Sequence, residues 1–122
     1  MEWMIEQKRK VAGYELSLSG TKVGDDILLC VQGGEKPHIG CVVQAIPRAS
    51  LSDKSKVSCT SSVMNLVGHK DEYICRMVAE KVCVNNSVAV VCTGGVHIDN
   101  ISQDEIKELI QAAKEMAEDI KF

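Results

Sequence analysis

Each of the three histidines in this 122-residue sequence lies in a short stretch marked by glycine. The stretches are GGEKPHIG (33–40, with His38), VGHKDE (67–72, with His69) and GGVHIDNIS (94–102, with His97). Imidazole serves as a general acid or base, a hydrogen-bonding group or a ligand of divalent metal ions. Glycine permits sharp turns and lets another group approach the backbone closely. The repeated pairing suggests that the three stretches build one site.

Two kinds of shared site fit this pattern. In the first, the neutral imidazoles of His38, His69 and His97 bind a divalent first-row metal in a small metal-dependent enzyme. In the second, the glycines border a polar cleft in which backbone N–H groups approach a bound ligand. Neither site requires the histidines to be close in sequence. The sequence contains no GxGxxG, phosphate-binding loop or HExxH motif that would decide between them.

Charged residues near His69 leave the kind of ligand open. Lys70 or Arg76 would be the partner of a phosphate if the ligand carries one, because anions need charge-assisted donors. Asp71 and Glu72 suit a cation better, or a salt bridge to Arg76. Asp71 and Asp99 would orient neighbouring imidazoles by accepting their N–H groups. Each stretch also has an ordinary explanation, as a strand connection, a helix start with acidic residues near its positive end, or a strand-to-helix loop.

The composition is that of a globular protein, with 45% hydrophobic and 25% charged residues. A net charge of −3 gives no electrostatic support to nucleic-acid binding. No apolar run approaches the ~18 residues of a membrane span, and the start MEWMIEQKRK lacks the apolar core of a secretory signal. The six cysteines include no CxxC pair, which favours reduced, buried thiols over a zinc site. We therefore expect a cytoplasmic protein that binds neither nucleic acid nor membrane.

The hydrophobic pattern predicts the elements that position the three stretches. Period-two alternation or short apolar runs predict strands, and the spacing i, i+3, i+4 predicts helices. Ser102 and Glu105 form a capping box at the start of the last helix. The expected strands are 13–20, 27–32, 38–46, 56–66 and 88–93, with the second and third forming a hairpin, and the expected helices are 70–83 and 102–120. This order predicts one α+β domain over residues 1–122, with a mainly antiparallel sheet and two helices packed on one face.

Three blocks of the sequence resemble a known family. GGEKPHIG (33–40), GHKDEYICRMVAEKV (68–82) and GGVHIDNISQDEI (94–106) are similar, in order and spacing, to the small subunit that accompanies gallate decarboxylase, in the prenylated-flavin chaperone family. The resemblance covers roughly residues 10 to 120. The matching motif positions are Gly33, Gly34, Pro37, His38, Gly40, His69, Lys70, Asp71, Gly95, His97 and Ile101.

The resemblance implies a non-catalytic accessory protein that binds or delivers prenylated FMN, or FMN, for a UbiD-type decarboxylase. It also implies a fold similar to that of proteasome assembly chaperones. A homodimer is expected on physical grounds as well, because the apolar strands 27–32 and 88–93 leave the sheet face away from the helices in need of cover. A protein-assembly chaperone that binds no ligand is the alternative outside enzymes.

Overall fold

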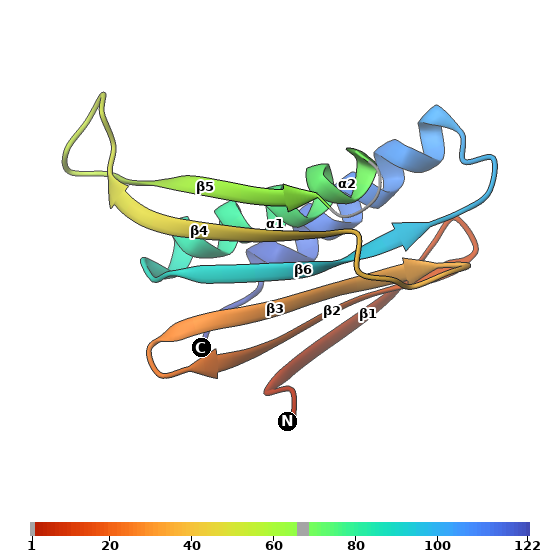
Figure 1. Cartoon of the computed structure of the whole chain (residues 1–122), viewed down its shortest axis with the longest axis horizontal. Helices are drawn as coiled ribbons and strands as arrows, with labels where there is room; N and C mark the ends of the chain where they lie inside the picture. Colours follow the sequence, from red (N-terminus) through yellow and green to blue (C-terminus); the bar gives the residue numbers. More distant parts are fainter. Residues whose placement is uncertain (1, 66–68) are drawn as a thin grey trace.

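The computed structural model describes residues 2–65 and 69–122, without the side chains of residues 69–71. Two helices and six strands form within the described residues (Figure 1). In chain order they are β1 (Ile5–Val11), β2 (Tyr14–Val23), β3 (Asp26–Gly34), β4 (Cys41–Ala49), β5 (Val57–Asn65), α1 (His69–Asn86), β6 (Val90–His97) and α2 (Gln103–Glu118).

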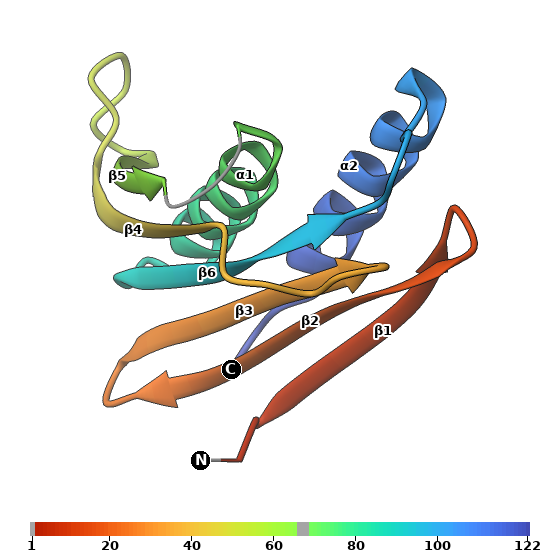
Figure 2. The same ribbon diagram turned by 45° about the vertical axis from the view of Figure 1, so that its right-hand side comes forward.

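The strands form a single sheet in the order β1-β2-β3-β6-β4-β5. Every neighbouring pair is antiparallel except β3 and β6, which run parallel. α1 packs against β4, β5 and β6, and α2 packs against α1, β1 and β2. Both helices therefore cover the same face of the sheet (Figure 2). The predicted α+β class, a mainly antiparallel sheet with two helices on one face, is confirmed.

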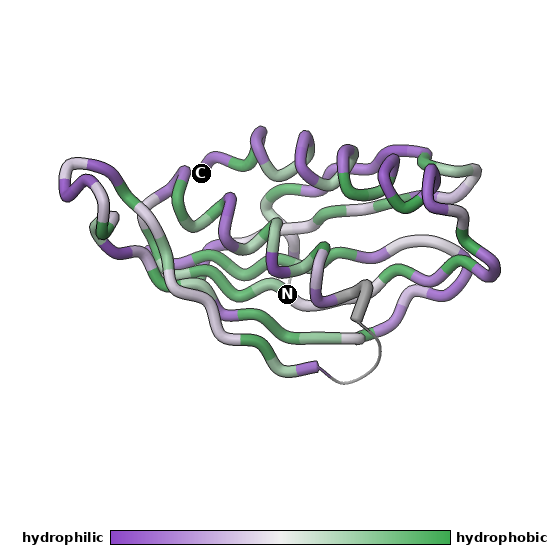
Figure 3. Tube along the Cα trace, turned by 90° about the horizontal axis from the view of Figure 1, so that it is seen from above, coloured by the Kyte–Doolittle hydropathy of each residue, from purple (hydrophilic) through white to green (hydrophobic). Residues whose placement is uncertain are grey.

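The hydrophobic core fills the space between the sheet and the helices. Alternate residues of the inner strands point into it, namely Leu16, Leu18, Ile27, Leu29, Val31, Cys41, Val43, Ala45, Val90 and Cys92. The predicted helical stripes meet them, with Ile74, Cys75, Val78 and Val82 of α1 and Leu109, Ala113, Met116 and Ala117 of α2 buried. Burying each large aliphatic side chain contributes about 1.5–3 kcal/mol. Along α2, Figure 3 shows hydrophobic residues toward the sheet and hydrophilic residues away from it.

The boundaries of the helices have local causes. The Ser102 hydroxyl accepts the backbone N–H of Glu105 at 3.1 Å, and the Glu105 carboxylate accepts the N–H of Ser102 at 3.0 Å. The predicted capping box at the start of α2 is therefore confirmed. α1 ends at Asn86, after which Ser87 adopts a positive φ of 54°. Neither helix, over the residues described, is long and apolar enough to cross a membrane.

The first strand, β1, has a sequence that does not predict a strand. The basic run QKRK is typical of a solvated entry to the sheet, but it lies inside an edge strand paired with β2. A two-residue turn at Ala12 and Gly13, both with positive φ, joins these strands. The Gln7 amide donates to the Met116 carbonyl of α2, and Arg9 forms an ion pair with Glu115. Long polar side chains of β1 thus contact α2, and for this reason β1 lacks the apolar alternation by which a strand is predicted from sequence.

The predicted hairpin between the second and third expected strands is wrong, because β6 lies between β3 and β4. β6 pairs in parallel with β3 and antiparallel with β4, and it continues to His97. Gly94 and Gly95 are therefore strand residues and not part of a strand-to-helix loop. The connection 35–40 must cross β6, and it does so on the face opposite the helices (Figures 1 and 2).

β6 requires one glycine beneath the crossing and another beside β3. The Glu35 N–H donates to the His97 carbonyl at 2.7 Å, and the Gly40 N–H donates to the Gly94 carbonyl at 2.8 Å, so both ends of the connection are bonded to β6. A side chain at Gly95 would place its Cβ 2.9 Å from the His38 carbonyl oxygen and 2.8 Å from Nε2. A side chain at Gly94, where φ is +135°, would drive its Cβ into the Val31 carbonyl oxygen. The glycines let the backbones pass at contact distance.

All six cysteines have free thiols, and most are buried as the sequence predicts. Cys41, Cys75, Cys83 and Cys92 are buried, whereas Cys30 and Cys59 are half-buried. Burial raises the pKa of the Cys83 thiol to about 11, because the thiolate is poorly solvated beside Cys59 and Glu80. The thiols therefore pack as small apolar side chains.

Replacing Gly94 with Ala tests the close approach of β6 to β3. We expect Gly94→Ala to lower the free energy of unfolding by at least ~3 kcal/mol, because its Cβ would collide with a backbone oxygen in the neighbouring strand. Gly24→Ala is the matched control, since Gly24 also has a positive φ (63°) but an added Cβ would meet no atom within 4 Å. The control should lose only about 1–2 kcal/mol. Equal losses of the two variants in urea unfolding would contradict the account.

Candidate functional site

An apolar cavity of about 380 Å³ opens where the two helices begin and β6 ends. Residues from the second and third sequence blocks line it, together with the first three turns of α2. The lining residues are Tyr73, Ile74, Val96, His97, Ile98, Ile101, Ile106, Leu109 and Ile110. Its volume lies at the small end of the range of ~300–1,000 Å³ that is usual for small-molecule sites.

Part of the cavity wall comes from α2 residues that are only half-buried. Leu109 of α2 is buried, but Ile106 and Ile110 on the same stripe are only half-buried. Ile98 is buried beyond the end of β6, and Ile101 is half-buried between β6 and α2. The apolar stripe of α2 is therefore longer than the core that it covers, and its surplus forms a wall of branched aliphatic side chains.

A chain of hydrogen bonds extends from His97, one of the lining residues, and we call its members (His97, Asp99, Glu35 and Tyr14) the mouth of the cavity. Nε2 of His97 donates to Asp99 at 2.8 Å. The carboxylate of Glu35, from the crossing connection, accepts the Asp99 N–H at 3.3 Å and the Tyr14 hydroxyl at 2.9 Å. The first and third sequence blocks are thus joined through side chains, with β2 contributing Tyr14. The predicted role of Asp99, as a carboxylate that orients a neighbouring imidazole, agrees with this geometry.

The mouth is acidic. The hydrogen bond and charge of His97 hold the pKa of Asp99 below its usual range, so Asp99 is ionised at neutral pH. The hydrogen bond to Glu35 raises the pKa of Tyr14, and the charges of Asp99 and Glu105 raise it further. Among the lining residues whose side chains are described, His97 is the one histidine, and Asp99 already accepts its N–H. The cavity therefore suits an apolar ligand body and opposes an anion at this side of its mouth.

His38 occupies the opposite face of β6. Its ring lies against Gly95, and its Nδ1–H donates to the Lys36 carbonyl at 2.9 Å. Residues 95 and 97 are two positions apart on one strand, so the His38 ring lies within about 11 Å of the Cα atom of His97. His38 nevertheless lines neither this cavity nor the groove described below. Among the histidines with described side chains, only His97 borders the cavity.

The predicted glycines allow neighbouring backbone segments to approach closely. A Cβ at Gly33 would lie 2.9 Å from the Glu15 carbonyl oxygen, and one at Gly34 (φ +78°) would collide with the His97 carbonyl oxygen. Gly40 is buried at the far end of the crossing, and Pro37 is exposed in its middle. These residues shape the connection that carries Glu35 to the cavity mouth.

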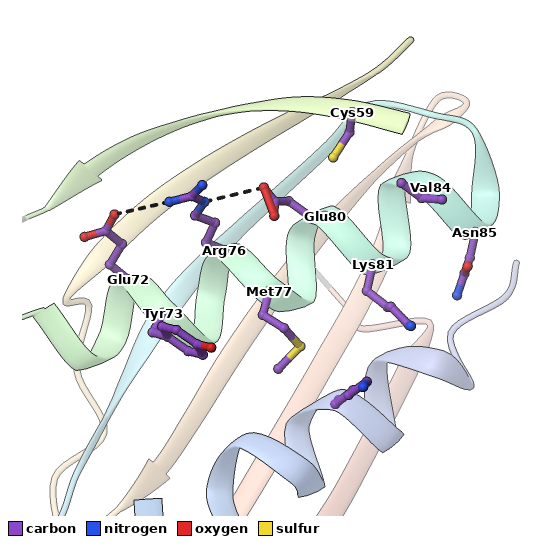
Figure 4. Close-up of a pocket in the computed structure, with 10 residues that line it drawn as sticks. Cys59, Glu72, Tyr73, Arg76, Met77, Glu80, Lys81, Val84 and Asn85 are labelled. Carbon is purple, nitrogen blue, oxygen red and sulfur yellow. Dashed lines mark hydrogen bonds and ion pairs between the residues drawn. The ribbon is translucent and has the colours of Figure 1, made fainter. Parts of the chain in front are cut away.

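Arg76, the expected phosphate partner, lies in a separate groove along the outer face of α1. The groove has a volume of about 800 Å³ and runs between β5, α1 and α2. The Arg76 guanidinium lies between Glu72 and Glu80, at 4.0 and 3.4 Å (Figure 4). Glu72 also accepts a hydrogen bond from Asn65 at 2.9 Å. Tyr73 borders both the groove and the cavity, so the two hollows adjoin there.

The predictions for His69, Lys70 and Asp71 concern side chains outside the described part of the chain. The three-histidine metal site therefore remains a prediction. Within the side chains that are described, no group of three or more His, Cys, Asp or Glu residues is placed to hold a metal ion.

Sequence reasoning missed the groups that shape the cavity. The pattern around Tyr14 indicates only a strand, and Glu35 does not stand out beside the glycines and histidine of GGEKPHIG. The isoleucines fit the core of the molecule equally well. One signal was available in the sequence, since two of the six residues 96–101 are isoleucines in a segment expected to be a loop, and Val96 adds a third aliphatic side chain.

Comparison with known proteins places the chain in a family. The family model of the prenylated flavin chaperone LpdD-like domain matches residues 10–121. Protein LpdD of Lactiplantibacillus plantarum is 28% identical over 109 residues, which cover 89% of this chain and 74% of LpdD. Among solved structures, the chain is similar to one in the crystal structure of a novel chaperone complex for yeast 20S proteasome assembly. That similarity has a TM-score of 0.48 and 13% identity, and covers 92% of this chain and 96% of the other.

Removing the His97 side chain tests the electrostatics of the mouth. In His97→Ala, the pKa of Asp99 should rise toward ~3.9, because its hydrogen-bond donor is lost. The depressed pKa contributes stability that is present above the unfolded-state pKa and lost as pH falls through the folded-state pKa. Carboxyl NMR titration measures the change. Asp53 is the internal control, because its pKa is lowered by hydrogen bonds from Ser55 and should not respond to the loss of His97. An Asp99 pKa that is the same in both proteins would refute the pairing.

Proposed function

Because the chain belongs to the family of LpdD-like prenylated flavin chaperones, we propose that it binds prenylated FMN in the cavity between α1, α2 and β6. The family match supports the ligand, and the cavity supports the place. All three sequence blocks contribute to this corner, through Glu35 at the mouth, Tyr73 and Ile74 in one wall, and Val96 to Ile101 in another.

The lining suits the ring system of a prenylated flavin. The isoalloxazine ring is flat and largely apolar on its faces, and prenylation adds further apolar surface. Burying such surface contributes about 25 cal/mol per Å². Tyr73 lies at the edge of the cavity with 62% of its surface exposed, where an aromatic ring can stack on a bound flavin. Unmodified FMN would use the same walls with less apolar contact.

We assign the chain an accessory role, delivering its ligand to a UbiD-type decarboxylase. Its residues bind and orient the flavin, and His97 and Asp99 present a fixed polar edge at the mouth. Of the other expected contacts, His69, Lys70 and Asp71 remain predictions, and a His69→Ala variant should weaken binding without loss of the fold. The single domain over 1–122 and the cytoplasmic location are part of the same proposal, since free thiols persist in a reducing compartment.

We also propose that the protein is a homodimer that covers the face of the sheet opposite the helices. The pairing register places Val42, Ile46 and Met64 on that face, with Leu28 and Val91 beside them. Ile46 is 44% exposed and Met64 is 64% exposed. Contiguous apolar patches beyond a few hundred Å² are uncommon on monomers.

Filling the cavity tests the binding site. Ile101→Trp should weaken prenylated FMN binding at least tenfold, because the indole would occupy the space between β6 and α2. Leu51→Trp introduces the same side chain on a loop, at a residue that is 91% exposed, and should leave affinity unchanged. Fluorescence titration measures both affinities, and circular dichroism checks the fold. Unchanged binding by a folded Ile101→Trp variant would place the flavin elsewhere.

Light scattering tests the dimer. At micromolar concentration we expect twice the mass of the chain. Ile46→Asp should shift the protein toward monomer, because the substitution places a charge in the centre of the apolar face. A monomeric wild-type protein would refute the proposed interface.

A further inference from the structure

We infer that the cavity holds the ring system of prenylated FMN and leaves the phosphate outside, in solvent. This orientation rests on the proposed function and adds to it the part of the ligand that the protein recognises. Three features carry the inference: the apolar walls, the charges at the mouth, and the pairing of the nearest described cations.

Among the described residues, the interior offers nothing that would hold a phosphate. Apart from Tyr73 and His97 at its edge, every described lining residue is aliphatic. A phosphate carries a charge of about −1.5 to −2 at neutral pH, and burying it there without charged donors would be costly. The ring system is therefore the part of the ligand that enters.

The β6 side of the mouth repels an anion. Asp99 lies there with its carboxylate bonded to His97, and Glu35 follows within hydrogen-bond reach of the Asp99 backbone. Glu105 lies near enough to affect Tyr14, the other partner of Glu35. A phosphate beside this group would face carboxylates on the crossing connection, on the loop after β6 and on the first turn of α2.

Lys36, on the crossing connection, lies near enough to lower the pKa of Asp99, so its charge is offset by that carboxylate. The cations of the neighbouring groove also face acidic side chains. Beyond Tyr73, the neighbouring groove contains Arg76 between Glu72 and Glu80. Lys81 in the same groove forms an ion pair with Glu118 of α2. Lys114 lines the groove as well, and its charge also acts on Glu118. Three cations therefore face the carboxylates of Glu72, Glu80 and Glu118, so the groove is close to electrically neutral and gives a phosphate little advantage over water.

The orientation has a consequence for delivery. A chaperone that binds the ring and not the phosphate leaves the most highly charged group of the ligand exposed. A receiving enzyme can then bind the phosphate first, while the reactive ring is still enclosed. Transfer of the ring follows without exposing both ends of the ligand to water together.

Removing the phosphate from the ligand tests the inference. Affinities are measured for prenylated FMN and for the prenylated riboflavin obtained from it with a phosphatase. At an ionic strength of about 0.02 M, the dephosphorylated ligand should bind equally well or up to about tenfold more tightly, because the carboxylates no longer repel it. This difference should shrink toward zero at about 0.5 M salt, where surface charges are screened.

Neutral variants assign any difference to named carboxylates. Asp99→Asn and Glu35→Gln should each strengthen the binding of prenylated FMN about two- to fivefold relative to the binding of prenylated riboflavin by the same variant. Asp25→Asn is the matched control, because it removes the same charge from an exposed turn between β2 and β3. It should alter neither affinity.

Two results would overturn the inference while leaving the proposed function intact. One is tighter binding of prenylated FMN than of its dephosphorylated form by tenfold or more. The other is a loss of affinity for prenylated FMN alone in Lys70→Ala or Arg76→Ala, which would show that the phosphate has a cationic partner. If neither ligand binds, the proposed function itself is wrong.

Discussion

The fold depends on the close passage of two backbones at β6. This strand, the last in the sequence, inserts between β3 and β4, so the connection 35–40 has to cross it. The crossing is bonded to β6 at both ends, and Gly95 leaves no side chain in its way, while Gly94 allows β6 to approach β3. Without that contact, β6 could not occupy the centre of the sheet. β6 also connects α1 to α2 in the chain, so its position determines that both helices pack on the same face.

The same insertion creates the candidate site. β6 delivers His97 and Asp99 to the corner where the two helices begin, and the crossing brings Glu35 to the same place. The site therefore has aliphatic side chains inside the cavity and carboxylates at its mouth. A ligand with one apolar end and one charged end can enter in only one favourable orientation. Binding affinity and orientation therefore come from separate sets of residues.

Local signals in the sequence predict the parts of the fold that depend on local energetics. The capping box at Ser102 and the stripes of α1 and α2 can be identified because each is a short-range pattern. The place of β6 cannot, because pairing between distant strands leaves no periodicity in either strand. Its glycines therefore resemble those of a loop. At the site, the His97–Asp99 pair follows from sequence proximity, but the contacts of Glu35 with Tyr14 and Asp99 join residues 21 and 64 positions apart.

Methyl NMR of isoleucine offers the most direct test of the central claim, that prenylated flavin binds among the aliphatic walls between α1, α2 and β6. Five isoleucines line the cavity, namely Ile74, Ile98, Ile101, Ile106 and Ile110. Ile27 lies in the core and Ile39 on the crossing, so they report on other parts of the molecule. On addition of prenylated FMN, the account predicts large shifts of the cavity methyl signals and small shifts of the other two. Shifts confined to Ile39, or the absence of any shift at saturating ligand, would contradict it.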